Sequence, residues 1–417
     1  MIRFVGRRRL LKAVAGGMGF LISPALAANS IRIGFSMPLT GPSAPAGKMF
    51  LLGREIWRDE VNANGGLLGR PVQFVYYDDQ SNPSVVPGIY EKLLDVDKVD
   101  LVLSPFSTNL IAASMPLVMQ HKMAYMALFG TAVNDAFKYD RYFQILPNGP
   151  EGNRGLSTGF FQVAATMRPA PRTVAILAED TEYGQTAAAG ARANVAATDL
   201  KIVYDRSYPP TLTDHSPVVR AVKATGPDLL FVASYPAATV NIIRSVHEIG
   251  LQPRMLGGPM IGAQFSQTKA KLGSLLNGLV VLDNYVPEPT MKFPGVEEFL
   301  KKYQARAESN GVDPLGYWAP FAFASLQILG EAVTRVGTID QEKIARYIHG
   351  KSFATVIGEV RFDEIGEWVK TRFLFIQYQN IQGNDIDQFR KTGKQVILYP
   401  PELKSGDLIY PFARAEL

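Results

Sequence analysis

The feature that most constrains the fold of this chain is an alternation of strand-like and helix-like segments that occurs twice. In the first half, strand-like runs at residues 31–35, 72–77 and 101–103 alternate with segments at 47–63 and 87–97 that we interpret as helices. Such an alternation is typical of a parallel sheet with helices on both faces and right-handed crossovers. The first half therefore predicts an α/β lobe.

The alternation starts again after a Pro- and Gly-containing stretch at residues 143–150, which we interpret as a crossing to a second lobe. The segments expected after it are strands at 174–178, 202–208, 229–232 and near 255, helices at 184–197, 217–224, 237–249, 295–310 and 319–336, late strands at 358–362 and 373–378, and an extended tail from 396. We therefore expect two doubly wound, Rossmann-like lobes. Open α/β sheets bind ligands at the carboxyl ends of their strands, so facing lobes predict a small ligand between them.

Two neighbouring strand ends in the first half carry small hydroxylated turns. The run at 101–103 is followed by Ser107 and Thr108, and a strand-like run at 123–128 ends in Phe129, Gly130 and Thr131. A helix that starts at such a turn offers free N–H groups and the positive end of its dipole to an anion. One turn alone is more simply an ordinary helix cap, but two adjacent turns predict a pocket.

Residues 1–27 have the parts of an export signal. A basic start precedes an apolar segment at 10–22, and Ala25-Leu26-Ala27 suits cleavage. The run at Arg7-Arg8-Arg9 resembles the twin-arginine pattern, and the general export route also stays open. Five of the 43 Lys and Arg residues and no acid lie in this segment, so the rest of the chain balances its 38 acidic residues. A neutral chain without basic blocks is not expected to bind nucleic acid.

The motif search gives little support for catalysis, a metal or a cofactor. The chain contains no cysteine, no GxGxxG after its first strand and no GxSxG. Its four histidines are too widely spaced for a zinc motif. Asp78-Asp79 is interpreted as a solvated strand end. We therefore expect a binding protein without cofactors; an amide-type hydrolase is a less favoured alternative.

Several segments together resemble one known family. They lie, in the order of the chain, at residues 33–42, 60–69, 77–83, 180–185, 358–363 and 398–411. In order and spacing they are similar to the periplasmic type I solute-binding proteins of ABC importers, the branched-chain amino-acid (Leu/Ile/Val-binding) family. The resemblance implies a soluble, monomeric periplasmic receptor that delivers a ligand to a membrane permease. A sensor for a signalling receptor is the alternative within this fold.

The resemblance also implies a lobe division and roles for site residues. The lobes would be 28–147 with 285–355 and 148–284 with 356–417, joined by three hinge crossings and closing on the ligand. A ligand carboxylate would be held by Ser107, with Thr108 beside it, and by Gly130 and Thr131. The opposite lobe would contribute Tyr183 and Tyr235.

One position departs from the family pattern. Amino-acid binders place a glutamate after a Gly-Pro pair to receive the ligand ammonium, and here Gly258-Pro259 is followed by Met260. Losing that charge-assisted bond would weaken binding roughly 10- to 100-fold. Met260 and Phe129, with the two tyrosines, favour a carboxylate with an apolar or aromatic body. In the alternative, the ligand is still an amino acid and the missing acid is replaced by Glu179, Asp180 or Asp283.

Overall fold

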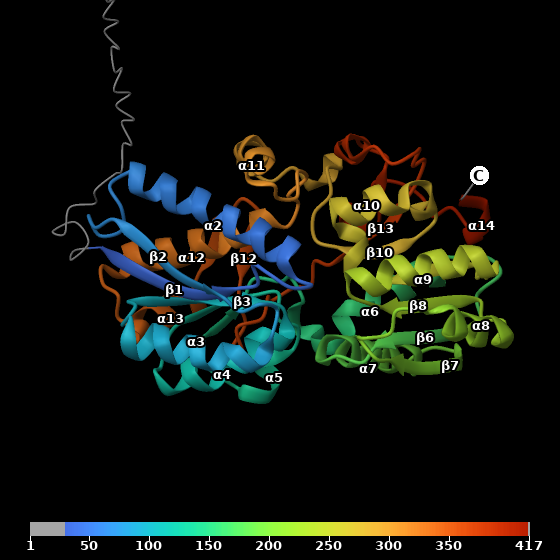
Figure 1. The fold of residues 1–417 in the computed structure, drawn as a ribbon, viewed down its shortest axis with the longest axis horizontal. Helices are drawn as coiled ribbons and strands as arrows, with labels where there is room; N and C mark the ends of the chain where they lie inside the picture. Colours follow the sequence, from blue (N-terminus) through green and yellow to red (C-terminus); the bar gives the residue numbers. More distant parts are fainter. Residues whose placement is uncertain (1–29, 416–417) are drawn as a thin grey trace, which may run out of the picture.

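The computed structural model describes residues 30–415, which form two α/β lobes lying side by side (Figure 1). The first lobe contains a five-stranded sheet in the order β2-β1-β3-β4-β5, and the second a seven-stranded sheet in the order β14-β13-β10-β9-β8-β6-β7. The predicted two-lobed α/β fold is confirmed. The predicted export signal at 1–27 lies outside the described residues.

The strands of the first sheet are all parallel, as expected. Their bounds are β1 Ile31–Met37, β2 Val72–Asp78, β3 Leu101–Phe106, β4 Tyr125–Leu128 and β5 Tyr142–Gln144. The strands of the second sheet are β6 Thr173–Glu179, β7 Lys201–Tyr208, β8 Leu229–Ala233, β9 Met255–Gly258, β10 Val280–Asp283, β13 Leu374–Tyr378 and β14 Gln395–Tyr399. Here β6 to β10 are parallel, whereas β13 and β14 add an antiparallel edge that the alternation did not predict.

Helices cover both faces of each sheet. In the first lobe they are α2 Ala44–Ala63, α3 Val86–Glu91, α4 Thr108–Gln120, α5 Val133–Phe137, α11 Val296–Asn310, α12 Ala319–Val336 and α13 Gln341–His349. In the second lobe they are α6 Gly155–Ala165, α7 Glu182–Val195, α8 Ser216–Thr225, α9 Pro236–Ile249, α10 Ser266–Leu272 and α14 Phe412–Ala415. Figure 1 shows how the blue N-terminal segments share a lobe with the orange α12 and α13.

The main differences from prediction lie in short elements. The sequence patterns did not reveal α5, α6, α10 and α13, or the strands β5 and β10. The tail expected to be extended from residue 396 instead pairs as β14 and ends in α14. Short elements carry too few apolar repeats to stand out from loops, and their formation depends on the neighbours they pack against.

The strand pair that precedes the third crossing bears on one predicted lobe boundary. Strand β11 (Ser352–Thr355) pairs with β12 (Gly358–Arg361), and the Phe362 ring lies 5.4 Å from the Phe143 ring of the first lobe. A boundary between 355 and 356 would divide this hairpin, because its two strands are hydrogen-bonded to each other. We therefore propose that the third crossing lies between β12 and β13. The other predicted boundaries remain proposals.

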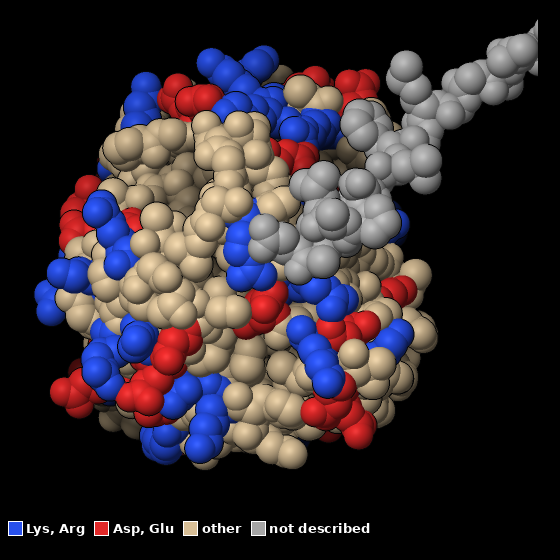
Figure 2. Space-filling model, turned by 90° about the vertical axis from the view of Figure 1, so that its left-hand side faces the viewer, with Lys and Arg blue, Asp and Glu red and all other residues tan. Residues whose placement is uncertain are grey.

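The surface carries both signs of charge. Over the outer end of the first lobe, Lys and Arg side chains lie among Asp and Glu side chains (Figure 2). Within residues 30–415, no helix has the length and apolar character required to cross a bilayer.

A close contact between α2 and α12 sets one wall of the space between the lobes. A Cβ atom on Gly53 of α2 would lie 2.8 Å from the carbonyl oxygen of Ala319, the first residue of α12. The neighbouring Trp318 stacks on Phe50 of α2, with ring centroids 6.0 Å apart. Glycine therefore allows the helices to approach closely enough for Trp318 to reach the aromatic core.

We predict that Gly53→Ala lowers the free energy of unfolding by about 1–3 kcal/mol, because the added methyl group meets backbone that cannot move aside. Gly88→Ala is the matched control: Gly88 lies in a helix, is exposed, and has open space where its Cβ would be. It should raise the free energy of unfolding by about 0.5–1 kcal/mol. Urea denaturation measures both, and equal effects of the two substitutions would contradict the packing argument.

Candidate ligand-binding cleft

The first predicted strand end is a turn with an unusual backbone. Strand β3 runs on through Pro105, three residues further than predicted, with an irregular register against β4 between Leu103 and Phe106. Ser107 follows with φ 88° and ψ 153° and precedes α4. Its side chain makes no capping hydrogen bond and instead lies within hydrogen-bonding reach of the Tyr235 phenol from the opposite lobe. The hydroxyl predicted to cap the helix therefore faces the space between the lobes.

The second predicted strand end lies beside the first. After β4, Phe129 and Ala132 have φ values of 64° and 54°. The Thr131 amide donates to Thr108 Oγ1 at 3.1 Å, which ties the two turns together. Positive φ at non-glycine residues costs about 1–3 kcal/mol each and is concentrated at functional sites. The predicted neighbourhood of the two turns is therefore present in the fold.

Two tyrosines of the second lobe face these turns. Tyr183 lies in the first turn of α7, Tyr235 directly precedes α9, and their ring centroids are 5.3 Å apart. Burial raises the pKa of both phenols, so both are protonated at neutral pH. The Tyr183 hydroxyl donates to the Pro259 carbonyl at 2.8 Å. Its donor is thus used within its own lobe, and its ring is the part that faces the cavity.

Together these residues enclose a narrow cavity between the lobes. Its lining consists of Phe106, Ser107, Thr108, Phe129, Thr131, Leu146, Leu156, Tyr183, Tyr235, Ile261, Gln264, Leu282, Asn284, Trp318 and Phe373. The free volume is about 30 Å³, enough for one or two water molecules. None of the lining residues is an Asp, Glu, Lys or Arg. The cavity is therefore small and uncharged, and six of its fifteen lining residues are aromatic.

A wider cleft of about 750 Å³ adjoins this cavity and shares Ser107 and Tyr235 with it. The cleft also contains Glu179, Arg244 and Lys271. Ser107 comes from the first lobe and Tyr235 from the second, so both lobes contribute to both hollows.

Two of the eight predicted site residues do not line either hollow. Gly130 lies behind the turn, where its carbonyl accepts a hydrogen bond from Gln144 Nε2. Met260 has no exposed surface, and it forms a bridge with Ser234 beside the sheet. The chain then turns into a short 3-10 helix at Ile261–Gln264, so Ile261 and Gln264 occupy the wall that had been assigned to Met260.

The sequence patterns missed Gln264, Asn284 and Trp318. Gln264 Oε1 and Asn284 Oδ1 are buried without a hydrogen-bond partner among the described residues. Trp318 packs edge-on against Phe129, with ring centroids 5.0 Å apart. No local motif marks Gln264 or Asn284, since each follows a strand end in an irregular segment. Trp318 directly precedes α12, and the helical periodicity of α12 was the one sequence pattern that could have pointed to it.

Of the three acids considered as substitutes for the missing glutamate, only Glu179 borders either hollow. Its carboxylate accepts the Tyr235 amide at 2.9 Å, and burial raises its pKa. Asp180 accepts from Gln185 Nε2 at 2.8 Å at the surface. Asp283 is buried beside Lys269, and burial raises its pKa to about 6. An ammonium group in the wider cleft would therefore have Glu179 as a partner.

We predict that Ser107→Gly raises the free energy of unfolding by about 1 kcal/mol relative to Ser107→Ala, because glycine adopts a φ of 88° without strain. Both variants lack the hydroxyl, so the difference between them measures the energetic cost of a side chain at this positive φ. Urea denaturation of the two proteins without ligand is the measurement. A less stable glycine variant would show that the turn is not strained.

Comparisons with known proteins agree with this architecture. Residues 30–380 match a family model described as periplasmic binding protein. The leucine-, isoleucine-, valine-, threonine- and alanine-binding protein of Pseudomonas aeruginosa is 22% identical over 364 residues, which cover 87% of this chain and 94% of that protein. The Leu/Ile/Val-binding protein homolog 7 of Brucella abortus is 23% identical and covers 93% of this chain and 96% of its own length.

Solved structures show the same fold. The branched-chain amino acid transporter substrate binding protein of Streptococcus pneumoniae, in complex with isoleucine, has a TM-score of 0.73 at 17% identity, covering 89% of this chain and all of that one. A solute binding protein of an ABC transporter from R. palustris, in complex with benzoate, has a TM-score of 0.73 at 18% identity. The match covers 88% of this chain and 95% of that one. With the family model spanning most of its length, this chain belongs to the periplasmic binding protein family and resembles the Leu/Ile/Val-binding proteins within it.

Proposed function

We propose that this chain is the substrate-binding receptor of an ABC importer and that it binds a small carboxylate with an apolar or aromatic body. The observation that carries the proposal is the narrow cavity between the lobes, which combines two hydroxylated helix starts with aromatic walls and has no ionised side chain in its lining. A ligand that fits both parts has one anionic end and an uncharged remainder.

The anionic end has its partners on the first lobe. Ser107 directly precedes α4, and the first N–H groups of a helix have no partner within it. These amides, the Ser107 hydroxyl and Thr131 lie at adjacent strand ends. Because the cavity contains no Lys or Arg, hydrogen bonds and the helix dipole are the forces available to hold a carboxylate.

The uncharged remainder would lie among the rings of Phe129, Tyr183, Tyr235 and Trp318. Gln264 Oε1 and Asn284 Oδ1 add two acceptors without donors to the same cavity. A buried acceptor without a partner is costly, so a ligand that carries a hydroxyl or N–H group would gain from reaching them. This favours an aromatic acid with a polar substituent over an unsubstituted hydrocarbon acid.

An amino acid is the second candidate ligand, and Glu179 is the observation that favours it. Glu179 lies in the wider cleft together with Ser107 and Tyr235, so one molecule could contact all three. Its carboxylate already accepts the Tyr235 amide, and burial raises its pKa. Both features make Glu179 a weaker partner for an ammonium group than a free carboxylate.

Delivery would depend on closure of the lobes. The free volume of about 30 Å³ is too small for an organic acid, so entry requires the lobes or side chains to separate. The ligand would then stabilise the closed arrangement through contacts that only that arrangement makes. The export signal expected at 1–27 and the family match support a periplasmic receptor that docks on a membrane permease. A sensor that passes the closed form to a signalling receptor remains the alternative.

We predict that Ser107→Ala weakens binding of the carboxylate ligand about 10- to 100-fold, because it removes one hydrogen bond to a charged group. The midpoint of thermal unfolding without ligand should remain nearly unchanged. Isothermal titration calorimetry with a ligand found by thermal-shift screening of benzoate, hydroxybenzoates and branched-chain amino acids is the measurement. Ser84→Ala, at an exposed position outside both hollows, is the control, and equal affinities of the two variants would contradict the site.

We further predict that Glu179→Gln changes benzoate affinity less than about threefold, because an aromatic acid has no ammonium group for this carboxylate to bind. If the ligand is an amino acid, the same variant should bind leucine at least about tenfold more weakly than the wild type. Titration of both proteins with benzoate and with leucine measures this. Wild-type binding of leucine without benzoate binding would overturn the preference for an aromatic acid.

A further inference from the structure

A third hollow between the lobes, here called the hinge pocket, lies at two of the chain crossings. It is lined by Ala132, Asp135, Ala136, Gly149, Pro150, Glu151, Gly152, Asn153, Gln185, Thr186, Ala189, Ile365 and Glu367. Its free volume is about 630 Å³, and it shares no residue with the narrow cavity or the wider cleft. The walls come from α5, from the crossing at 149–153, from α7 and from the third crossing, so both lobes contribute.

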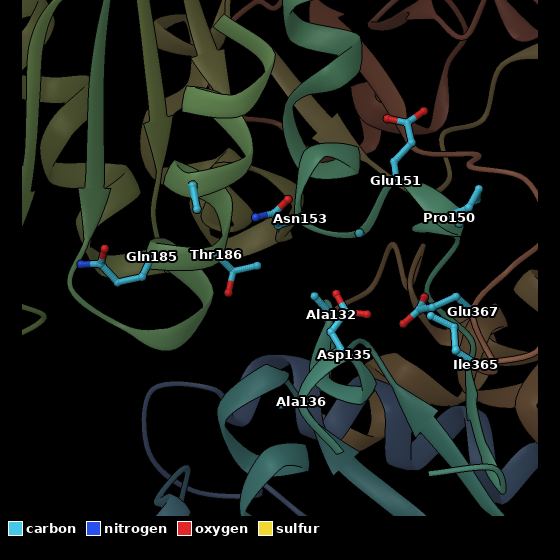
Figure 3. Close-up of a pocket in the computed structure, with 13 residues that line it drawn as sticks. Ala132, Asp135, Ala136, Pro150, Glu151, Asn153, Gln185, Thr186, Ile365 and Glu367 are labelled. Atoms are coloured by element: carbon cyan, nitrogen blue, oxygen red, sulfur yellow. The ribbon is translucent and has the colours of Figure 1, made fainter. Parts of the chain in front are cut away.

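The hinge pocket is acidic. Asp135, Glu151 and Glu367 line it, and no Lys or Arg does. Figure 3 shows Asp135 and Glu367 with their carboxylates pointing toward each other from two different segments. Glu151 lies on the opposite side with its carboxylate pointing away from Asp135 and Glu367, and it accepts a hydrogen bond from the Thr158 hydroxyl.

Glu367 is the feature that a structural role leaves unexplained. Glu367 is only 3% exposed to solvent, yet neither of its carboxylate oxygens has a hydrogen-bond partner among the described residues. Its backbone is fixed in a tight turn, where its amide donates to Asp363 Oδ1 at 2.9 Å. A buried carboxylate held in place without a donor is expensive, and that cost is relieved by a cation or by a proton.

The surrounding groups do not supply that cation. Burial is the first cause that raises the pKa of Glu367, and Asp363 and Asp135 raise it further. Burial raises the pKa of the Tyr142 phenol on β5, and the negative charge of Glu367 raises it further. Within residues 30–415, no group of three or more His, Cys, Asp and Glu residues is arranged to hold a metal ion. The carboxylates are therefore better placed for a larger cation.

We propose that the hinge pocket binds a small organic cation, with an ammonium group held between the carboxylates of Asp135 and Glu367. The other walls match such a ligand. Gln185 and Thr186 provide further polar groups, and Pro150 and Ile365 provide apolar surface for a short hydrocarbon chain. The Glu151 carboxylate points away from this pair and is held by Thr158, so the pocket holds one ammonium group, and a short alkyl diamine is the probe that carries it on a chain of suitable length. Because both lobes form the walls, an occupant favours the lobe arrangement in which those walls are in place.

The test uses isothermal titration calorimetry and thermal unfolding of the purified protein with 1,4-diaminobutane at pH 7.5. We expect saturable binding that is weakened about 10- to 100-fold in Glu367→Gln and in Asp135→Asn, since each removes one charged partner. Glu364→Gln is the matched control: it lies in the same turn, is exposed and does not line the pocket. It should bind as the wild type does.

Two further readouts separate a cation site from a general charge effect. Binding should release protons, so its heat should depend on the ionisation enthalpy of the buffer, because the ammonium displaces the proton from Glu367. Magnesium chloride at equal ionic strength should not raise the unfolding temperature as the diamine does. Absence of saturable diamine binding, equal binding by Glu367→Gln, or an equal response to magnesium would each overturn the proposal.

Stability without any ligand tests the folding of the variant. The pKa of Glu367 is higher in the folded protein than in the unfolded chain. The wild-type protein therefore loses stability as the pH rises above the ordinary glutamate pKa, whereas the Glu367→Gln variant does not. Glu367→Gln should therefore unfold at a higher temperature than wild type at pH 8, with a smaller difference at pH 5. A lower unfolding temperature at both pH values would show that the carboxylate is satisfied in the fold, which also overturns the proposal.

Discussion

The left-handed turns after β3 and β4 are the constraint on which the candidate site depends. Ser107 and Phe129 both have positive φ, a conformation that side chains other than glycine adopt at a cost. The cost is offset by packing: the Phe129 ring lies 5.3 Å from Phe50 and 5.0 Å from Trp318. Trp318 in turn depends on the close approach of α2 and α12 at Gly53. The geometry of the turn at Phe129 thus depends on the contact between α2 and α12 in the core of the first lobe.

The charges of the molecule are distributed unevenly between its hollows. The narrow cavity has only uncharged polar, aliphatic and aromatic side chains, whereas the wider cleft holds Glu179 with Arg244 and Lys271. The hinge pocket has only acidic charge. Basic groups for an acid therefore lie in the wider cleft, and the acidic partners proposed for a cation lie in the hinge pocket. Two ligands of opposite charge could be held by the same pair of lobes without competing.

In the proposed function, the cross-lobe contact between Ser107 and Tyr235 would link ligand recognition to closure of the lobes. The two residues belong to different lobes, and both line the narrow cavity and the wider cleft. A ligand carboxylate at Ser107 would replace a hydroxyl contact with a charge-assisted one, which is roughly twice as strong. The hinge pocket is also lined by residues of both lobes, so the same closing motion would change its shape. Such sites are coupled only through the equilibrium between lobe arrangements.

The longer strands and helices and their alternation were predictable from the sequence alone, because apolar runs and helical periodicity are local properties. The predicted strands at 31–35, 72–77 and 174–178 lie within β1, β2 and β6. The turns at Ser107 and Phe129 were also visible, since small polar residues after an apolar run mark a strand end.

Tertiary structure decided which of these residues share a cavity. Met260 follows a strand end as Tyr235 does, yet the backbone turns it into the core and brings Gln264 forward. Glu367 and Asp135 are 232 positions apart in the sequence, and only the third crossing brings them to one pocket. Such contacts depend on how lobes and crossings pack, and packing between distant segments leaves no periodic trace in the sequence.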